Sequence, residues 1–412
     1  MNPFETKSKS VNEYFMDWKR LSPKPYDKNK ASPYTKVRQI LMNGTEFESN
    51  WFLHQFARHT ADNDLRRAIA IVRQQEQQQQ KRLSALKPPD ENILEVTIAY
   101  EQLAVDLTAI LAQRETDQNN INALNFALLE DFDHLYRFAN LLKMDYGIDA
   151  ERLVGGYTEI TPGRPTIAEH RLGADNVRYS MDGKKAELFS ILVGNIITAA
   201  EQQTMNYYMN VGAFYPNDYG RKMYAEIAMI EEEHVSQYES LKDPNMTWLA
   251  CWVAHEYTEC YLYASMMQDE TDPHIRAIYA EHYEMEVAHL KMATELLARY
   301  EGKDFSTVLP TADFPELLRF GGNKEYIRQV LAGTVWLTGE KEDYVSVADL
   351  KPNSNFAIYQ SKVNSAPNPS HTVTTMAIKS LGEDYRFEDS PNPVKELQSR
   401  KRDNVTVGRP VK

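Results

Sequence analysis

The 412-residue sequence contains only two cysteines, Cys251 and Cys260. They lie nine positions apart in a stretch that reads as one helix, a spacing that suits neither a disulfide nor a cysteine-based zinc site. A fold held together by disulfides is therefore excluded. We expect a reducing compartment, the cytoplasm, by default.

Long apolar runs and an excess of basic residues are also missing. No apolar run approaches the roughly 18–20 residues of a membrane span, and the opening segment MNPFETKSKS lacks the apolar core of a signal peptide. The 46 Lys and Arg residues are outnumbered by 59 Asp and Glu residues, so the formal net charge is −13. We expect neither a membrane nor a nucleic acid as partner, whereas many carboxylates suit cation binding.

The sequence does contain long stretches of helical periodicity, which predict an all-α fold. Ser32-Pro33 resembles an N-cap followed by proline at the first helical position. Clusters of Gly, Pro and Asp interrupt the pattern and predict turns or linkers. The predicted segments are an N-terminal arm at 1–31, a first four-helix bundle at 32–145, a linker at 146–184, a second four-helix bundle at 185–302 and a mostly irregular C-terminal extension at 303–412.

The second helical block has the clearer boundaries. Turn residues stand at 215–218 and 243–245, Asp272-Pro273 predicts a helix start, and Gly302 predicts a helix end. Short connections between long helices indicate antiparallel neighbours in a bundle. The predicted helices are about 185–213, 219–241, 246–269 and 273–301.

Two Glu-x-x-His motifs stand in this block, Glu231 with His234 and Glu286 with His289. Residues three apart share one face of a helix, so the carboxylate and the imidazole of each motif can reach one ion. A single motif is weak because Glu is common on helices. Two motifs on the second and fourth helices of one predicted bundle are a much stronger signal.

The other two helices each offer one carboxylate at a matching position. Glu201 lies 30 residues before Glu231, and Glu256 lies 30 residues before Glu286. Glu201, Glu231 and Glu286 also lie on the apolar stripes of their predicted helices. The predicted ligands of the second bundle are thus Glu201, Glu231, His234, Glu256, Glu286 and His289.

Further residues near these ligands have less certain roles. Tyr208 and Tyr263 each follow a predicted ligand by seven residues and could hydrogen-bond the ligands or be oxidised, although most tyrosines simply pack in the core. Glu259, one turn beyond Glu256, is a candidate extra ligand. Glu232 and Glu284, next to Glu231 and near Glu286, are also candidates for extra or substitute ligands.

Four carboxylates buried together are unfavourable unless something neutralises their charge. Two divalent ions would do so, because four positive charges balance four negative ones. Mixed carboxylate and imidazole ligands favour iron, manganese or zinc over calcium or magnesium. We therefore predict two metal ions, iron first and manganese or zinc as alternatives, in the second bundle.

Residues of similar chemistry occur 155 positions before the six predicted ligands of the second bundle. There all four carboxylate positions are acidic, and one of two histidines is kept. This pattern predicts a tandem repeat. The residues of the weaker first-half site are Glu46, Glu76, Gln79, Glu101, Asp131 and His134.

The sequence does not decide whether these first-half residues bind metal. Gln79 replaces a histidine with a poorer ligand, and Asn43-Gly44 weakens the predicted helix before Glu46. Glu48 and Glu130 compete with Glu46 and Asp131 as ligands. A half-site or a structural relic is the alternative to a working metal site.

With these motifs the sequence resembles the ferritin-like superfamily of dinuclear carboxylate proteins, and rubrerythrin in particular. The resemblance covers 185–301 well and 33–145 loosely. It implies that the six second-half ligands hold a di-iron pair which reduces dioxygen or peroxide. Rubrerythrins commonly carry a rubredoxin module with paired Cys-x-x-Cys motifs. Two isolated cysteines cannot build one, so electrons would come from a separate donor.

The leading hypothesis is therefore a di-iron oxidoreductase acting on peroxide or dioxygen. A second hypothesis is an oxygenase of a small organic substrate, which would need an apolar cavity beside the metals. A third is a non-enzymatic metal-binding or structural protein whose arm and tail build an assembly such as a homo-oligomer.

Overall fold

The computed structural model describes residues 1–163, 168–384, 386, 388–398 and 407. Short parts of the predicted linker and much of the end of the predicted extension lie outside these described residues. Twelve α-helices and one two-stranded sheet form within them. The predicted all-α class is confirmed apart from this small sheet.

The chain divides into two compact units, each built from three separate stretches. Unit 1 comprises Met1–Glu91, Ser180–Gln203 and Lys242–Phe320, and unit 2 comprises Asn92–Tyr179, Thr204–Leu241 and Gly321–Lys412. The two predicted bundles were contiguous in sequence, at 32–145 and 185–302. The observed units differ from this prediction because each one takes helices from both halves of the chain.

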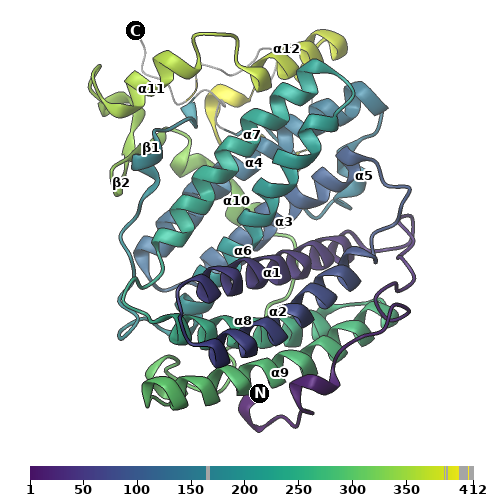
Figure 1. The fold of residues 1–412 in the computed structure, drawn as a ribbon. Coiled ribbons are helices and arrows are strands. Elements are labelled where there is room, and N and C mark those ends of the chain that lie inside the picture. Colours follow the sequence, from purple (N-terminus) through teal and green to yellow (C-terminus); the bar gives the residue numbers. More distant parts are fainter. Residues whose placement is uncertain (164–167, 385, 387, 399–406, 408–412) are drawn as a thin grey trace. The chain divides into compact units, whose positions relative to one another are not determined.

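Two helical hairpins form most of unit 1. They are α1 (Pro33–Arg58) with α2 (Asn63–Ser84), and α8 (Trp248–Asp269) with α9 (Pro273–Glu301). α1 contacts α8 and α2 contacts α9, and Figure 1 shows the four helices side by side. Short connections within each hairpin explain why its helices are antiparallel neighbours.

Smaller elements complete unit 1. The arm contributes two short 3₁₀ helices, η1 and η2, which contact α9, and η2 also contacts α2. A third, η6, follows α9, and the first part of α6 lies in this unit. Their bounds are Pro3–Glu5 for η1, Val11–Glu13 for η2, Leu188–Val211 for α6 and Phe305–Thr307 for η6.

Unit 2 contains the hairpin of α3 (Ile93–Arg114) and α4 (Gln118–Tyr146), with α7 (Asp218–Ser240) against α4. The end of α6 and the 3₁₀ helix η5 (Gly212–Phe214) precede α7. Helix α12 contacts both α4 and α7, and α10 contacts α4. The core of unit 2 therefore includes elements from the predicted C-terminal extension.

The predicted linker and extension carry more regular structure than their sequences suggested. The linker holds α5 and η4. The extension holds three helices, a hairpin of β1 and β2 with Leu337 opposite Ser346, and three 3₁₀ helices, of which η6 is the first. The bounds are Ala150–Leu153 for α5, Gly173–Asn176 for η4, Lys324–Thr334 for α10, Leu337–Glu340 for β1, Asp343–Ser346 for β2, Val347–Asp349 for η7, Asn355–Val363 for α11, Pro369–Leu381 for α12 and Lys395–Leu397 for η8.

The predicted helix starts and ends agree with the observed caps. The side chain of Ser32 accepts a hydrogen bond at the start of α1, and the side chain of Asp272 does so at the start of α9. Gly302 ends α9 with a φ of 65°, and Gly147 ends α4 with a φ of 67°. Only glycine adopts this left-handed conformation at little cost, which is why each helix stops there.

The helix bounds recur along the chain at the offset found in the sequence. Helices α1 to α4 begin at residues 33, 63, 93 and 118, and adding 155 gives 188, 218, 248 and 273, the first residues of α6 to α9. Gly147 and Gly302 are related by the same offset. The two halves thus share a succession of four helices.

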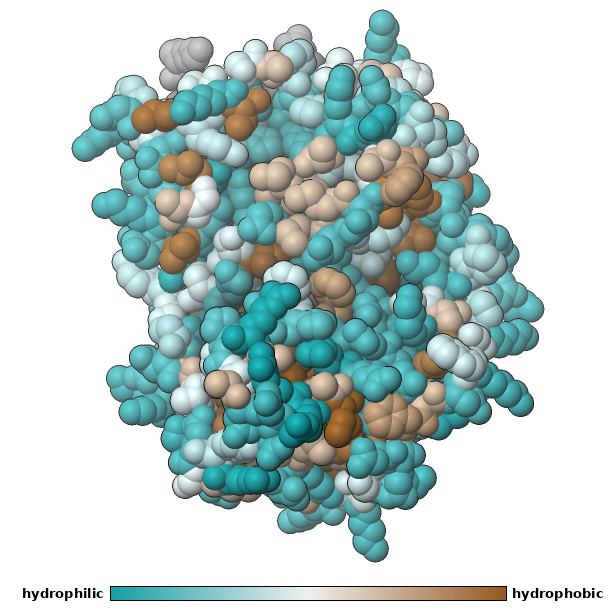
Figure 2. Space-filling view, viewed as in Figure 1, coloured by the Kyte–Doolittle hydropathy of each residue, from teal (hydrophilic) through white to brown (hydrophobic). Residues whose placement is uncertain are grey.

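The surface is mostly polar in the view of Figure 2, where hydrophilic side chains cover much of the face and apolar ones gather in small groups. Among the helices of the described residues, none combines the length and apolar character needed to cross a lipid bilayer.

Candidate metal centres

Helices α2, α8 and α9 of unit 1 bring acidic side chains and one histidine together. Ligand atoms of Glu76, Glu256, Glu286 and His289 all lie within 4.8 Å of one another. Nδ1 of His289 lies 2.9 Å from Oε1 of Glu76 and 3.1 Å from Oε2 of Glu286. The group has the donor atoms that a transition metal binds.

A second group of acids adjoins the first. Ligand atoms of Glu46, Glu76 and Glu259 also lie within 4.8 Å of one another, and Glu76 belongs to both groups. All six side chains are 0% exposed. We call these residues the unit 1 centre: Glu46, Glu76, Glu256, Glu259, Glu286 and His289.

Helical spacing explains how two helices each place two of these residues inside. Glu286 and His289 are three apart on α9, and Glu256 and Glu259 are three apart on α8, so each pair shares a face. Helix α8 is buried on nearly all sides from Leu249 to Met266. Both of its glutamates therefore lie in the interior.

Burial and mutual repulsion set the charge of the unit 1 centre. Burial, together with the nearby charge of Glu76, raises the pKa of Glu46, Glu256, Glu259 and Glu286. Burial acts on Glu76 as well, but the charge and hydrogen bond of His289 bring the pKa of Glu76 below its ordinary value. One histidine cannot balance five carboxylates, so protons or cations must neutralise the rest.

Several oxygen atoms of the unit 1 centre lack a hydrogen-bond partner among the described residues. They are both carboxylate oxygens of Glu259, Oε2 of Glu46 and Oε2 of Glu256. Buried polar atoms in folded proteins nearly always have partners, because an unsatisfied one costs free energy. Bound cations would give these oxygens partners, so the residues present fit a metal site.

Gln75 on α2 fixes the orientation of His289. Its Oε1 lies 2.8 Å from Nε2 of His289, and its amide nitrogen donates to the carbonyl of Val11 in η2 at 2.5 Å. An amide oxygen only accepts hydrogen bonds, so Nε2 carries the ring proton and Nδ1 faces the carboxylates. Such support of a ligand histidine is typical of metal sites.

Other side chains hold the carboxylates of the unit 1 centre. The amide of Gln79 donates to Glu286, and the indole of Trp252 donates to Glu256. Gln79 was predicted at a ligand position. Its amide nitrogen, which cannot bind a cation, instead contacts a carboxylate and orients it.

Unit 2 contains a second cluster of the same chemical type. Ligand atoms of Asp131, Glu231 and His234 lie within 4.8 Å of one another, as do those of Glu101, His134 and Glu231. Nδ1 of His134 lies 3.0 Å from Oε1 of Glu231, and Nδ1 of His234 lies 3.3 Å from Oδ1 of Asp131. We call these five residues the unit 2 centre.

The histidines dominate the electrostatics of the unit 2 centre. Burial alone would raise the pKa of Glu231, but hydrogen bonds from His134 and His234 lower it to about 2. Burial opposes a charge on His134, yet its contacts with Glu169 and Glu231 raise its pKa well above the ordinary value. Glu231 is thus an ionised carboxylate at the middle of the cluster.

At each histidine of the unit 2 centre, a carboxylate lies near Nε2, the ring nitrogen on the side away from the cluster. Nε2 of His234 lies 2.8 Å from Oε2 of Glu130, which the guanidinium of Arg171 holds through both carboxylate oxygens. Nε2 of His134 lies 3.8 Å from Oε2 of Glu169. A carboxylate on the far nitrogen makes an imidazole a stronger metal ligand.

The two tyrosines that the sequence singled out hydrogen-bond candidate ligands. The hydroxyl of Tyr208 donates to Glu101 at 2.5 Å, and that of Tyr263 donates to Glu46. Both partners lie on other helices, whereas the sequence had placed each tyrosine near the ligand of its own helix. Burial and the adjacent carboxylate raise the pKa of both hydroxyls well above the ordinary value.

The structure distributes the predicted ligands differently from the prediction. Of the six second-half ligands, unit 1 holds Glu256, Glu286 and His289, and unit 2 holds Glu231 and His234. Glu201 is buried on α6, in the stretch that unit 1 includes. The first-half ligands are divided in the same way: Glu46, Glu76 and Gln79 lie in unit 1, and Glu101, Asp131 and His134 lie in unit 2.

The alternatives that the sequence left open have definite places. Glu259 is part of the unit 1 centre, whereas Glu48 is outside it. Glu130 contacts Nε2 of His234 and is not one of the candidate ligands of the unit 2 centre. Glu232 is half-buried and Glu284 is exposed, so neither faces a centre.

Sequence reasoning missed the supporting residues Gln75, Trp252, Glu169 and Arg171. Gln75 directly precedes a predicted ligand, and only its contact with His289 reveals its role. Glu169 and Arg171 lie in the predicted linker, where no periodicity places a side chain. Two opposite charges so close together in a supposed linker were the only available signal.

The chain matches no protein-family model, and comparisons with curated proteins and with solved structures returned no similar protein. The two centres are therefore interpreted from their own chemistry.

Proposed function

We propose that the protein is a dinuclear metal-carboxylate protein with a metal pair in unit 1, and that it acts as an oxidoreductase. The observation that carries the proposal is the unit 1 centre itself. Five fully buried carboxyl groups and one histidine meet there, and several of their oxygens have no hydrogen-bond partner among the described residues. Without cations, such a cluster opposes folding.

The donor set favours particular metals. Glu46, Glu76, Glu256, Glu259 and Glu286 would contribute oxygens and His289 one nitrogen to the two ions. Carboxylates alone would suit calcium or magnesium, but an added imidazole favours iron, manganese or zinc. Two divalent ions would leave this set close to neutral, which favours a pair over a single ion.

We extend the proposal to unit 2. Its centre has two histidines and three carboxylates, Glu101, Asp131 and Glu231. Glu201, predicted from the sequence as a ligand with Glu231 and His234, is assigned to neither centre and stays a prediction. Both units would then hold metal, whereas the sequence left the first-half site open.

The resemblance to ferritin-like proteins remains part of the proposal. It is supported by helical hairpins whose ligands face one another and by helix starts that recur at an offset of 155 residues. These features favour a duplicated pair of hairpins. In this proposal the hairpins of unit 1 form one four-helix bundle from both halves of the chain.

An iron pair would supply two electrons for the reduction of dioxygen or peroxide. Within unit 1, Tyr263 holds the carboxylate of Glu46 and Gln75 holds His289, so that the ligand positions are fixed before metal binds. The two isolated cysteines cannot build a rubredoxin module, which needs paired Cys-x-x-Cys motifs. Electrons would therefore come from a separate donor.

Metal analysis of anaerobically purified full-length protein, combined with a peroxide consumption assay, tests the proposal. We expect iron in both units and peroxide turnover. Glu286→Gln with His289→Ala should remove the metal of unit 1, and Glu231→Gln with His234→Ala that of unit 2. Glu284→Gln, an exposed position on the same helix as Glu286, is the matched control.

Three results would contradict the proposal or part of it. Unchanged peroxide turnover in the chain that carries all four substitutions would eliminate the oxidoreductase function. Full occupancy by zinc in the natively purified protein would favour a structural metal site. Absence of any bound metal after loading would eliminate both readings.

A further inference from the structure

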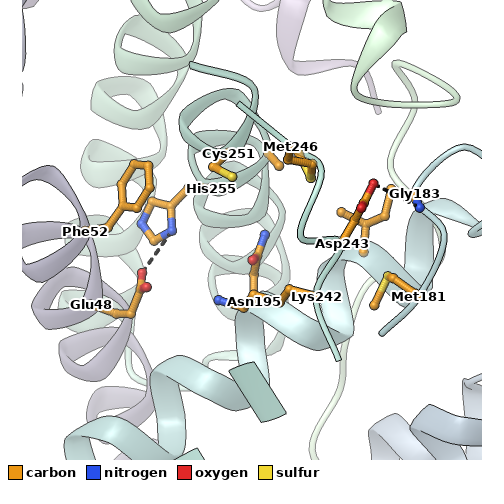
Figure 3. Close-up of a pocket in the computed structure, with 12 residues that line it drawn as sticks. Glu48, Phe52, Met181, Gly183, Asn195, Lys242, Asp243, Met246, Cys251 and His255 are labelled. Atoms are coloured by element: carbon orange, nitrogen blue, oxygen red, sulfur yellow. Dashed lines mark hydrogen bonds and ion pairs between the residues drawn. The ribbon is translucent and has the colours of Figure 1, made fainter. Parts of the chain in front are cut away.

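A cavity of about 160 Å³ lies within unit 1, between α1, α6 and α8 and the connection that precedes α8. Its apolar wall includes Phe52, Met181, Ile191, Met246 and Ala254. Figure 3 shows the lining side chains, with Glu48 and Phe52 on α1 opposite His255 on α8. The unit 1 centre does not use this space.

The volume of the cavity limits what it can hold. An engineered apolar cavity of about 150 Å³ is known to bind benzene. A cavity of about 160 Å³ therefore accommodates one six-membered ring or a short aliphatic chain. Cofactors with several rings are too large for it.

One polar wall of the cavity has unused hydrogen-bonding capacity. Nδ1 of His255 lies 3.0 Å from Oε2 of Glu48, but this carboxylate oxygen receives no hydrogen bond from the described residues. Glu48 is only 8% exposed. A carboxylate oxygen has two lone pairs, so Oε2 of Glu48 can accept a hydrogen bond beside its ion pair with His255. This capacity favours a ligand that brings a donor, such as a hydroxyl group.

Other charges around the cavity disfavour an anionic ligand. The carboxylate of Asp243 already accepts hydrogen bonds from the backbone of Gly183 at 3.2 Å and of Asn245 at 2.9 Å. Glu48 and Asp243 outnumber Lys242, the only basic residue in the described lining besides His255. An organic anion would meet net negative charge, and a neutral molecule would not.

The geometry points to a binding site for a small neutral molecule that combines one apolar ring or short chain with a hydroxyl group directed at Glu48. Phenol is the simplest such molecule. Its ring would contact the apolar wall, and its O–H would donate to Oε2 of Glu48. This site is separate from the metal ligands, and binding there does not require a metal.

The cavity nevertheless lies next to the unit 1 centre. His255 separates the two, since its Nδ1 faces Glu48 and its Nε2 lies 3.5 Å from Oε1 of Glu259. A molecule bound against Glu48 would lie one imidazole away from a candidate metal ligand. A role as the substrate site of the metal centre rests on the proposed function, whereas the binding itself does not.

Calorimetric titration of the full chain with phenol, toluene and benzoate tests the inference in metal-free and in iron-loaded protein. For a ligand of this size we expect a Kd for phenol on the order of 0.1–1 mM. Toluene should bind at least tenfold more weakly because it lacks the donor, and benzoate should not bind measurably. Binding in the metal-free protein separates this inference from the proposed function.

Variants locate the site. Glu48→Leu should reduce the affinity for phenol to that for toluene and leave toluene binding unchanged. Cys251→Phe, which fills the cavity from its wall, should abolish both, whereas Cys251→Ser should retain both. Equal affinities for phenol and toluene, or phenol binding that survives Cys251→Phe, would overturn the inference.

Discussion

Nδ1 of His289 lies 2.9 Å from Oε1 of Glu76, although the two residues come from opposite halves of the sequence. Glu76 belongs to the hairpin of α1 and α2, and His289 belongs to that of α8 and α9. A pair of metal ions at this point would therefore join two hairpins that are distant along the chain. In the proposed function, metal binding and the pairing of the hairpins would therefore be coupled.

The first prediction follows from this contact. Glu76→Gln should remove as much metal as Glu286→Gln, because both residues serve the unit 1 centre. The unit 2 centre should keep its metal in both variants. Metal per chain, measured by mass spectrometry of the elements, checks this, with Glu284→Gln as the control that retains full content.

A contiguous arrangement of bundles makes the opposite prediction. There Glu76 would serve a site with Glu101, Asp131 and His134, and its loss would leave the site of Glu286 intact. A chain that carries both Glu76→Gln and Glu286→Gln distinguishes the two arrangements. Loss of metal from one centre agrees with the structure, and loss from two centres contradicts it.

The local part of the fold could be predicted from the sequence, because caps and turns act over a few residues. Ser32, Asp272 and Gly302 determine helix ends through their own side chains or backbone conformation. Periodicity likewise identified which glutamates lie on buried faces. These are interactions within one helix or one hairpin.

The pairing of the hairpins could not be predicted in the same way. Each hairpin has an apolar face with buried carboxylate side chains. The hairpin of α1 and α2 is therefore chemically compatible with the hairpin of α3 and α4 and with that of α8 and α9. The long connection at 146–184 allows both choices. Only packing among distant residues, such as the contact of Gln75 with His289, selects one of them.

Gln75 provides the second prediction. Gln75→Leu removes the oxygen that accepts the proton of Nε2 in His289, so the imidazole is no longer held with Nδ1 toward the carboxylates. Loss of such support typically lowers metal affinity 10- to 100-fold. Competition with a chelating dye measures the affinity of each variant for the same metal.

A neighbouring glutamine supplies the control for this prediction. Gln78 also binds the arm, through hydrogen bonds with the backbone of Met16 at 2.8 and 3.1 Å. Gln78→Leu should lower stability by about 1 kcal/mol, as the loss of a hydrogen bond does, and leave metal affinity unchanged. Equal loss of affinity in both variants would show that the arm matters rather than the contact with His289.

The third prediction concerns the carboxylate behind His234 in unit 2. Glu130→Gln preserves the shape of the side chain but removes the charge that strengthens the imidazole as a ligand. We expect the metal affinity of unit 2 to fall 10- to 100-fold and that of unit 1 to stay the same. Glu232→Gln, a half-buried position on α7, is the control.

The outcome for Glu130 also depends on Arg171. The guanidinium binds both Glu130 and Glu233, so Glu130→Gln leaves a buried charge with one carboxylate partner. Breaking a buried ion pair costs about 3–5 kcal/mol. Thermal unfolding of the metal-free variant quantifies this cost separately, and a variant that loses stability but no metal affinity would contradict the assigned role.

The fourth prediction is that metal-free protein loses stability as pH rises. The pKa values of Glu46, Glu256, Glu259 and Glu286 are raised in the folded state, so the folded chain holds protons that the unfolded chain has released above its carboxyl pKa. Stability then falls with pH by about 1.4 kcal/mol per pH unit for each extra proton. His289, whose folded pKa is raised well above its ordinary value, contributes stability that is full below pH 6.5 and is lost as the pH rises through the folded pKa.

Glu76 does not offset this trend. Its folded pKa is lowered, so its contribution is complete above its unfolded pKa and constant between pH 5 and 8. For a unit of this size each 1 kcal/mol corresponds to roughly 2–4 °C in Tm. Each carboxyl group that keeps its proton lowers stability by about 3.5 kcal/mol between pH 5.5 and 8. Calorimetry of metal-free protein should therefore show a Tm that falls by roughly 7–14 °C for each such group over this range. Metal-loaded protein should show a much smaller change, because its ligands have already lost their protons.

Glu259→Gln separates this explanation from general effects of pH. The substitution removes one buried carboxyl group whose pKa is raised and leaves a neutral side chain of similar shape. It should raise the Tm of metal-free protein at pH 8, flatten the dependence on pH and weaken metal binding. An unchanged slope would show that Glu259 does not hold a proton in the folded state. A variant that gains stability but loses metal binding would show that Glu259 serves metal binding rather than folding, as is common for residues of functional sites.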